Sequence, residues 1–71
     1  MDTILVSDIL GIFEDDAGPF VRISRPDGSF REGRIALEDA APLSARWKAA
    51  KLVDESEVFD CSEVKEWVVA D

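Results

Sequence analysis

Apolar and polar residues alternate most regularly in residues 20–24, where Val21 and Ile23 fall on one face. An alternation with a period of two is typical of a strand that buries one side. Residues 30–37 form a second strand-like segment, in which Gly33 marks a candidate β-bulge. Two such segments a few residues apart predict an antiparallel hairpin.

The four residues that follow Ser24 strengthen this prediction. They read Arg25-Pro26-Asp27-Gly28. Pro26 restricts φ to the value that a type I turn needs at its second position, and Gly28 can adopt the positive φ of a bulged hairpin loop. We therefore expect a central hairpin with its turn at Arg25–Gly28.

The N-terminal segment is apolar, but its periodicity fits two kinds of element. Residues 3–13 are rich in β-branched side chains, which favours a strand. A helix is the alternative, because four apolar residues would share one of its faces: Leu5, Ile9, Ile12 and Phe13. Residues 14–19 are expected to form a loop, since they end in the Gly18-Pro19 pair.

Residues 45–53 predict a helix, because they are rich in alanine and straight-chain side chains. Ser44 would be its N-cap, and residues 38–42 would form a connection. The buried face would contain Leu43, Trp47 and Ala50, with Arg46, Lys48 and Lys51 largely outside it. A strand is the rival interpretation, since Trp47, Ala49, Lys51 and Val53 also alternate.

The C-terminal segment also fits two interpretations. Residues 57–61 predict a short strand with Val58 pointing inward. Asp60 and Glu63 have the spacing of a capping box, which predicts a short helix within residues 61–70. Its apolar face would contain Cys61, Val64, Trp67 and Val68. The alternative is a final strand over residues 66–70.

The chain has 71 residues, of which 46% are hydrophobic, and this predicts one small folded domain over residues 1–71. The expected fold is α+β: a small antiparallel sheet of three to four strands with a central hairpin and one or two short helices. A core of this size rarely contributes more than about 3–5 kcal/mol. We therefore expect a tightly packed core, or a homodimer or partner that completes it.

Charge is sorted along the chain. Residues 1–16 carry five acids and no base, and residues 54–71 carry seven acids and one lysine. Residues 17–53 hold the other seven bases with four acids. The formal net charge is −8. Such a balance predicts attraction to basic surfaces rather than to nucleic acid or anionic membranes.

Composition argues against most catalytic chemistry. The chain has no histidine, which removes the usual general base and the commonest zinc ligand. Cys61 is interpreted as a small buried apolar residue, because Asp60 and Glu63 would raise the pKa of its thiol. A calcium loop beginning at Asp54 would need glycine where Phe59 stands. We therefore expect no enzyme, no metal site and no cofactor.

The expected location is the cytoplasm. A single cysteine suits a reducing compartment, and the apolar N-terminal segment lacks the basic residues of a secretory signal. No segment approaches the roughly 20 apolar residues that a membrane-spanning helix needs.

Two resemblances bear on function. Residues 13–21 resemble the opening of MbtH-like proteins, small acidic partners of nonribosomal peptide synthetases. Residues 24–31 lack the tryptophan of that family's binding motif, so the family is not assigned. In size and charge alone, the chain is similar to the compact acidic inhibitors of bacteriophages, anti-CRISPR proteins among them.

The leading hypothesis is a non-enzymatic protein-binding inhibitor or adaptor. Its acidic surface would dock on the basic, nucleic-acid-binding site of a larger protein and mimic nucleic acid. Trp47 is expected in the core and Trp67 at the centre of the interface. The candidate partner-binding residues are Asp54, Glu55, Glu57, Asp60, Glu63, Glu66, Trp67, Glu14, Asp15 and Asp16.

Two other functions are weighed against this one. In a self-assembling structural or accessory protein, the acidic ends of one subunit would pair with the basic middle of the next. Direct nucleic-acid binding would use a stacking platform on the hairpin: Phe20, Arg22, Phe30, Arg31 and Arg34. The flanking acids oppose a polyanion, so no direct contact with nucleic acid is expected.

Overall fold

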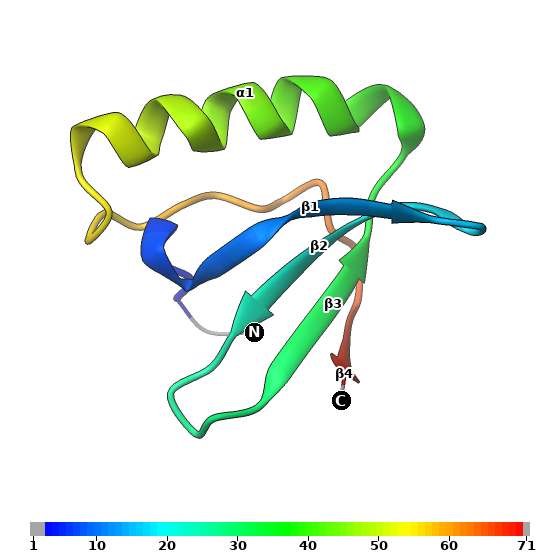
Figure 1. The fold of residues 1–71 in the computed structure, drawn as a ribbon, viewed down its shortest axis with the longest axis horizontal. Coiled ribbons are helices and arrows are strands. Elements are labelled where there is room, and N and C mark those ends of the chain that lie inside the picture. Colours follow the sequence, from blue (N-terminus) through cyan, green and yellow to red (C-terminus); the bar gives the residue numbers. More distant parts are fainter. Residues whose placement is uncertain (1–2, 71) are drawn as a thin grey trace.

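The computed structural model describes residues 3–70. Within this range the chain forms a four-stranded sheet and one long helix, arranged as in Figure 1. The elements are the 3-10 turn η1 (Val6–Asp8), β1 (Ile9–Asp15), β2 (Gly18–Ser24), β3 (Phe30–Arg34), α1 (Leu37–Val53) and β4 (Trp67–Ala70). The strands lie in the order β1-β2-β3-β4, and each neighbouring pair is antiparallel. The predicted α+β fold is confirmed, although α1 has 17 residues rather than being short.

The central hairpin joins β2 to β3 as predicted. The Gly28 N–H donates to the carbonyl of Arg25 at 2.9 Å, and Gly28 has a φ of 86°. The Arg25 N–H donates to the carbonyl of Ser29, also at 2.9 Å. The register between β2 and β3 runs without a shift, so the bulge predicted at Gly33 is wrong.

The strand interpretation of the N-terminal segment is confirmed in part. The strand begins at Ile9 and not at residue 3, because residues 6–8 form η1. The Asp8 carboxylate accepts the N–H of Leu5 at 2.9 Å, which closes this turn. At the other end β1 continues to Asp15, so the loop predicted over residues 14–19 reduces to a two-residue turn.

The helix α1 starts eight residues earlier than predicted, at Leu37 rather than Ala45. Residues 38–42 are therefore helical, and Ser44 is not the N-cap. Pro42 lacks the N–H that would bond to the carbonyl of Glu38. Glu38 is exposed, so water can satisfy that carbonyl. The burial of Leu43 and Trp47 favours a continuous helix through this position.

The predicted C-terminal helix is wrong, and the alternative of a final strand is correct. Asp60 accepts the N–H of Ser62 at 3.0 Å, which forms a local turn in place of a helix cap. Residues 57–61 form no strand, and Val58 makes only an isolated bridge with Leu5. Val58 is 66% exposed, whereas Phe59 is 6% exposed and belongs to the core.

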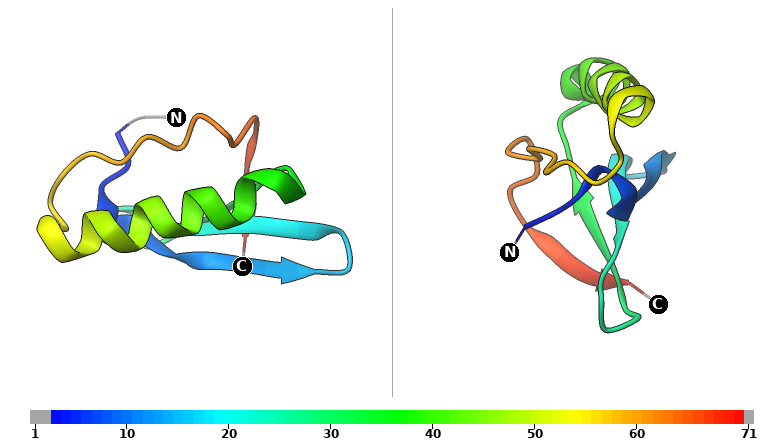
Figure 2. Two further views of the ribbon diagram at one scale, coloured as in Figure 1. Left: turned by 90° about the horizontal axis from the view of Figure 1, so that it is seen from above. Right: turned by 90° about the vertical axis from the view of Figure 1, so that its left-hand side faces the viewer.

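The core lies between α1 and one face of the sheet (Figure 2). Helix α1 packs against η1, β1 and β2, and the segment after it runs back beside the helix toward β4. The buried residues are Ile4, Val6, Ile9, Val21, Ile23, Ile35, Leu43, Trp47, Phe59 and Val64. Trp47 is a core residue as predicted, and its indole N–H donates to the carbonyl of Val6 at 3.2 Å.

Candidate interaction surfaces

The sheet face opposite α1 is not covered by another layer of the described chain. We call it the open face, and its residues on the three long strands are Phe13, Asp15, Phe20, Arg22, Ser24, Phe30, Glu32 and Arg34. They alternate with the buried residues of the same strands, as a pleated sheet requires. Phe13 and Phe20 pack with ring centroids 5.8 Å apart.

Arginine side chains already cover two of the phenyl rings on the open face. The Arg22 guanidinium lies 4.7 Å from the centre of the Phe30 ring and 2.6 Å from the Glu32 carboxylate. Arg34 lies 5.0 Å from the centre of the Phe20 ring. A nucleobase could stack on these rings only by displacing the arginines, which disfavours a nucleic-acid platform.

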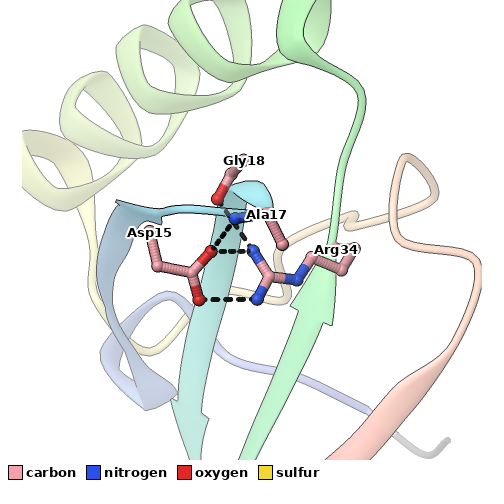
Figure 3. A network of polar contacts seen from close by, with 4 residues as sticks. All are labelled: Asp15, Ala17, Gly18 and Arg34. Atoms are coloured by element: carbon pink, nitrogen blue, oxygen red, sulfur yellow. Dashed lines mark hydrogen bonds and ion pairs between the residues drawn. The ribbon is translucent and has the colours of Figure 1, made fainter.

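Arg34 also forms an ion pair with Asp15 at the β1–β2 turn (Figure 3). Both carboxylate oxygens of Asp15 accept from Arg34 at 2.6 Å, and one also accepts the Ala17 N–H at 2.9 Å. Arg34 further donates to the carbonyl of Gly18 at 2.8 Å. The guanidinium holds the pKa of Asp15 below its usual value. Asp15 therefore closes the hairpin, while Glu14 and Asp16 are exposed at its tip.

Glu63, in the acidic C-terminal segment, is also engaged within the chain. Its carboxylate accepts from Arg46 at 2.9 Å, and this hydrogen bond lowers its pKa. Arg46 also donates to the carbonyl of Asp60 and lies 5.0 Å from the centre of the Phe59 ring. Two of the three ion pairs within residues 3–70 thus join an acidic end of the chain to its basic middle. The sorting of charge along the sequence partly reflects this folding contact.

The end of α1 combines exposed apolar side chains with acids. We call residues Leu52 to Glu57 the α1 tip. Leu52 is 89% exposed and Val53 is 84% exposed. Three carboxylates follow them at Asp54, Glu55 and Glu57, all on exposed residues.

Backbone contacts hold the α1 tip against the N-terminal segment. The carbonyls of Glu55 and Glu57 accept the N–H groups of Ser7 and Val6, both at 2.9 Å. The Asp54 carboxylate accepts the N–H and hydroxyl of Ser56 at 2.9 and 2.6 Å, which lowers the pKa of Asp54. The carboxylates of the tip are therefore presented on an ordered turn.

The ten predicted partner-binding residues do not form one continuous surface. The β1–β2 turn, with Glu14 to Asp16, and the turn at residues 54–57 lie at opposite ends of the long axis (Figures 1 and 2). Glu66 lines a groove of about 360 Å³ beside the open face, together with Phe20, Glu32, Gly33, Arg34, Lys65 and Val68. Trp67 is half-buried against Gly33 on the covered side of the sheet. Among the predicted acids within residues 3–70, those of the α1 tip stand beside the most exposed large apolar side chains, Leu52 and Val53.

Leu52 and Val53 were not among the residues selected from the sequence. A usable signal was present, because Leu52 lies nine residues after Leu43, and nine steps turn a helix by about 180° beyond whole turns. A leucine placed opposite the buried face of a helix is expected to meet solvent or a partner.

Cys61 lines a second groove of about 360 Å³ with Asp60, Trp67 and neighbouring residues. Burial, with a smaller effect of Glu63, raises the pKa of its thiol to about 11. A thiol with this pKa is a poor nucleophile at neutral pH. Within residues 3–70, no group of three potential ligands is placed to hold a metal ion.

Comparisons with protein-family models, curated proteins and solved structures found no match to this chain. The MbtH-like resemblance of residues 13–21 thus has no support from a family model. In the part of the chain that the structure describes, no helix combines the length and apolar character needed to cross a membrane.

Proposed function

We propose that the protein is a non-enzymatic inhibitor or adaptor that docks an acidic surface on the basic, nucleic-acid-binding site of a larger protein. The proposed docking surface contains fewer acids than the set predicted from the sequence. It consists of the α1 tip, where the exposed Leu52 and Val53 stand next to Asp54, Glu55 and Glu57. An apolar centre with a polar rim is the usual layout of a protein–protein interface.

The observation that supports this proposal best is the position of the acids at the C-terminal end of α1. A helix carries partial negative charge there, so stability alone favours lysine or arginine. Lys51 is the only base in the last turn, and Asp54 is the C-cap residue, with Glu55 and Glu57 after it. Asp54 is stabilised within the chain by two hydrogen bonds from Ser56, whereas the carboxylates of Glu55 and Glu57 have no such contact within residues 3–70. Positive charge on a partner would explain why these two acids stand in an unfavourable place.

Docking would follow the ordinary physics of charged interfaces. The net charge of −8 would steer the protein toward a basic surface, and the helix end would add to the negative field of the tip. Leu52 and Val53 would then bury apolar area in the partner. Because the partner's basic residues are those that contact nucleic acid, the two ligands would compete, and salt would weaken the complex.

The alternative of subunits joined through acidic ends and basic middles receives less support. Arg22, Arg34 and Arg46 each pair with a carboxylate of the same chain. A subunit contact that used these three arginines would have to break their pairs. We therefore do not favour charge pairing as the basis of self-association.

Charge reversal at the two ends of the molecule tests the proposal. The test variant is Glu55→Lys with Glu57→Lys, and the matched control is Glu14→Lys with Asp16→Lys, which changes net charge equally at the opposite end. Glu63 is left intact because its reversal would place a lysine against Arg46. A partner captured from the native host by the unaltered protein is purified and bound to a labelled oligonucleotide.

Unaltered protein and the control variant are expected to displace the oligonucleotide, and the tip variant is not. Circular dichroism confirms that all three proteins are folded. An equal loss in both variants would mean that only net charge matters. Full activity of the tip variant would show that its carboxylates are merely solvated, and either result rejects the α1 tip as the docking surface.

A further inference from the structure

The two edges of the sheet differ in how they are protected. The β1 edge has a register shift between Ile9 and Gly11, and its outer end carries Glu14 and Asp15. Bulges and charges are the usual means by which proteins prevent edge strands from pairing with other chains. The β4 edge has neither, since its sequence is Trp-Val-Val-Ala and it pairs with β3 in regular register.

Strand β4 is also weakly covered on both faces. Val68 is 50% exposed and Val69 is 67% exposed, although successive residues of a strand point to opposite sides. Helix α1 packs against β1 and β2 instead. Within residues 3–70, no strand pairs with the outer edge of β4. A four-residue apolar strand with a free edge is a ready template for another strand.

We propose that this edge pairs with β4 of a second copy of the chain. The two strands would run antiparallel about a two-fold axis and join both four-stranded sheets into one continuous sheet. With the axis at Val68, each Val68 lies opposite its equivalent in the other copy, and Val69 lies opposite Trp67. Directly opposed residues share a face in this register, so both exposed valines gain an apolar neighbour.

The distribution of charge favours the β4 edge as the place where a second copy of the chain binds. Two chains of net charge −8 repel each other, and they can approach closely only where acids are sparse. Residues 67–70 contain no charged side chain. Self-pairing at the β1 edge would instead bring Glu14 and Asp15 toward the acids of the other copy.

The resulting dimer is expected to be weak. Pairing four residues of each chain buries less than the roughly 800 Å² per partner of a standard stable interface. Dimer formation should therefore depend strongly on protein concentration. Added salt should strengthen it, because salt screens the repulsion between two acidic copies while the strand contact itself is uncharged. Docking of a basic partner at the α1 tip has the opposite salt dependence.

Sedimentation velocity from micromolar to millimolar protein, at low and high NaCl, tests the proposal. The disruptive variant is Val68→Lys, which places two lysines opposite each other across the axis. Its fold should survive, because Glu32 lies beside Val68 on β3 and supplies an opposite charge. Leu52→Lys is the control, with the same change of charge at an exposed residue far from β4.

Unaltered protein and Leu52→Lys are expected to dimerise with rising concentration and salt, and Val68→Lys to dimerise about tenfold more weakly. Amide hydrogen exchange in β4 should slow with concentration while exchange in β1 does not. A monomer at every concentration, an equally strong Val68→Lys dimer, or protection of β1 would overturn the proposal. Since Leu52→Lys impairs only the α1 tip, failure of partner docking is distinguished from failure of dimerisation.

Discussion

The two faces of the sheet are built from alternate residues of the same strands and are stabilised by different means. On the covered face, Val21 and Ile23 are fully buried beneath α1. On the open face, Phe20 and Arg22 keep part of their surface in solvent and are joined to neighbouring strands by ion pairs and cation–π contacts. Ion pairs and cation–π contacts thus occupy the face of the sheet that a second layer of helices or strands would cover in a larger protein.

This difference has energetic consequences. Burying an isoleucine side chain stabilises a fold by about 1.5–3 kcal/mol, whereas a partly exposed ion pair contributes about 0.2–1 kcal/mol. The covered face therefore determines whether the chain folds. The open face, the α1 tip and the β4 edge can vary with little loss of stability, which makes them suitable for binding.

The largest expected difference in the free energy of unfolding is between substitutions at two adjacent residues of β2, Ile23 and Arg22. Ile23→Val should lower the free energy of unfolding by about 0.5–1.5 kcal/mol, and Ile23→Ala by about 2–5 kcal/mol, enough to unfold much of the chain. Arg22→Ala should cost at most about 1 kcal/mol, through the contacts to Glu32 and Phe30. Urea denaturation followed by the fluorescence of Trp47 and Trp67 measures all three. If Arg22→Ala costs as much as Ile23→Ala, the open face is a structural layer and the comparison fails.

A smaller effect is expected at Gly33, where the covered face admits no side chain. A Cβ at this position would overlap Val64 and lie 3.0 Å from the Trp67 ring. Gly33→Ala should destabilise the protein by about 1–3 kcal/mol, because the segment that carries β4 must move outward. Glu32→Ala, on the open face of the same strand, is the control. Equal urea midpoints for the two variants would contradict this account of the packing.

The parts of the fold that could be predicted have local causes. Pro26 and Gly28 determine the hairpin turn through their own backbone preferences, so the sequence sufficed there. The start of α1 was missed because packing of Leu43 and Trp47 outweighs the local effect of Pro42. The C-terminal strand was misassigned because a capping-box spacing is a local signal, while the contact of Trp67 with β3 is tertiary.

The sequence predicted that the candidate surfaces would be negatively charged, but not which acids would be available to a partner. Composition shows where acids are abundant, but it does not show which of them are paired within the chain. Asp15 meets Arg34 across 19 residues of sequence, and Glu63 meets Arg46 across 17. These long-range pairs remove both acids from the set available to a partner. They account for two of the seven predicted residues that lie outside the α1 tip, and the position of the others in the fold accounts for the rest.

The smallest expected effect is on the stability of the protein in acid, to which the Asp15–Arg34 pair of the open face contributes. The pKa of Asp15 is held below its usual value of 3.8, chiefly by the hydrogen bond from Arg34. A carboxylate with a lowered pKa in the folded state stabilises the protein above the unfolded pKa, and this contribution is lost as pH falls through the folded pKa. Asp15→Asn should therefore lower the melting temperature slightly near neutral pH, and the difference from the unaltered protein should vanish in acid below pH 3.8. Asp16→Asn is the matched control and should melt like the unaltered protein, because Asp16 is a neighbouring exposed residue that takes part in none of the ion pairs found in the described part of the chain. If the Asp15→Asn difference persists unchanged into acid, the ion pair of Figure 3 does not stabilise the open face.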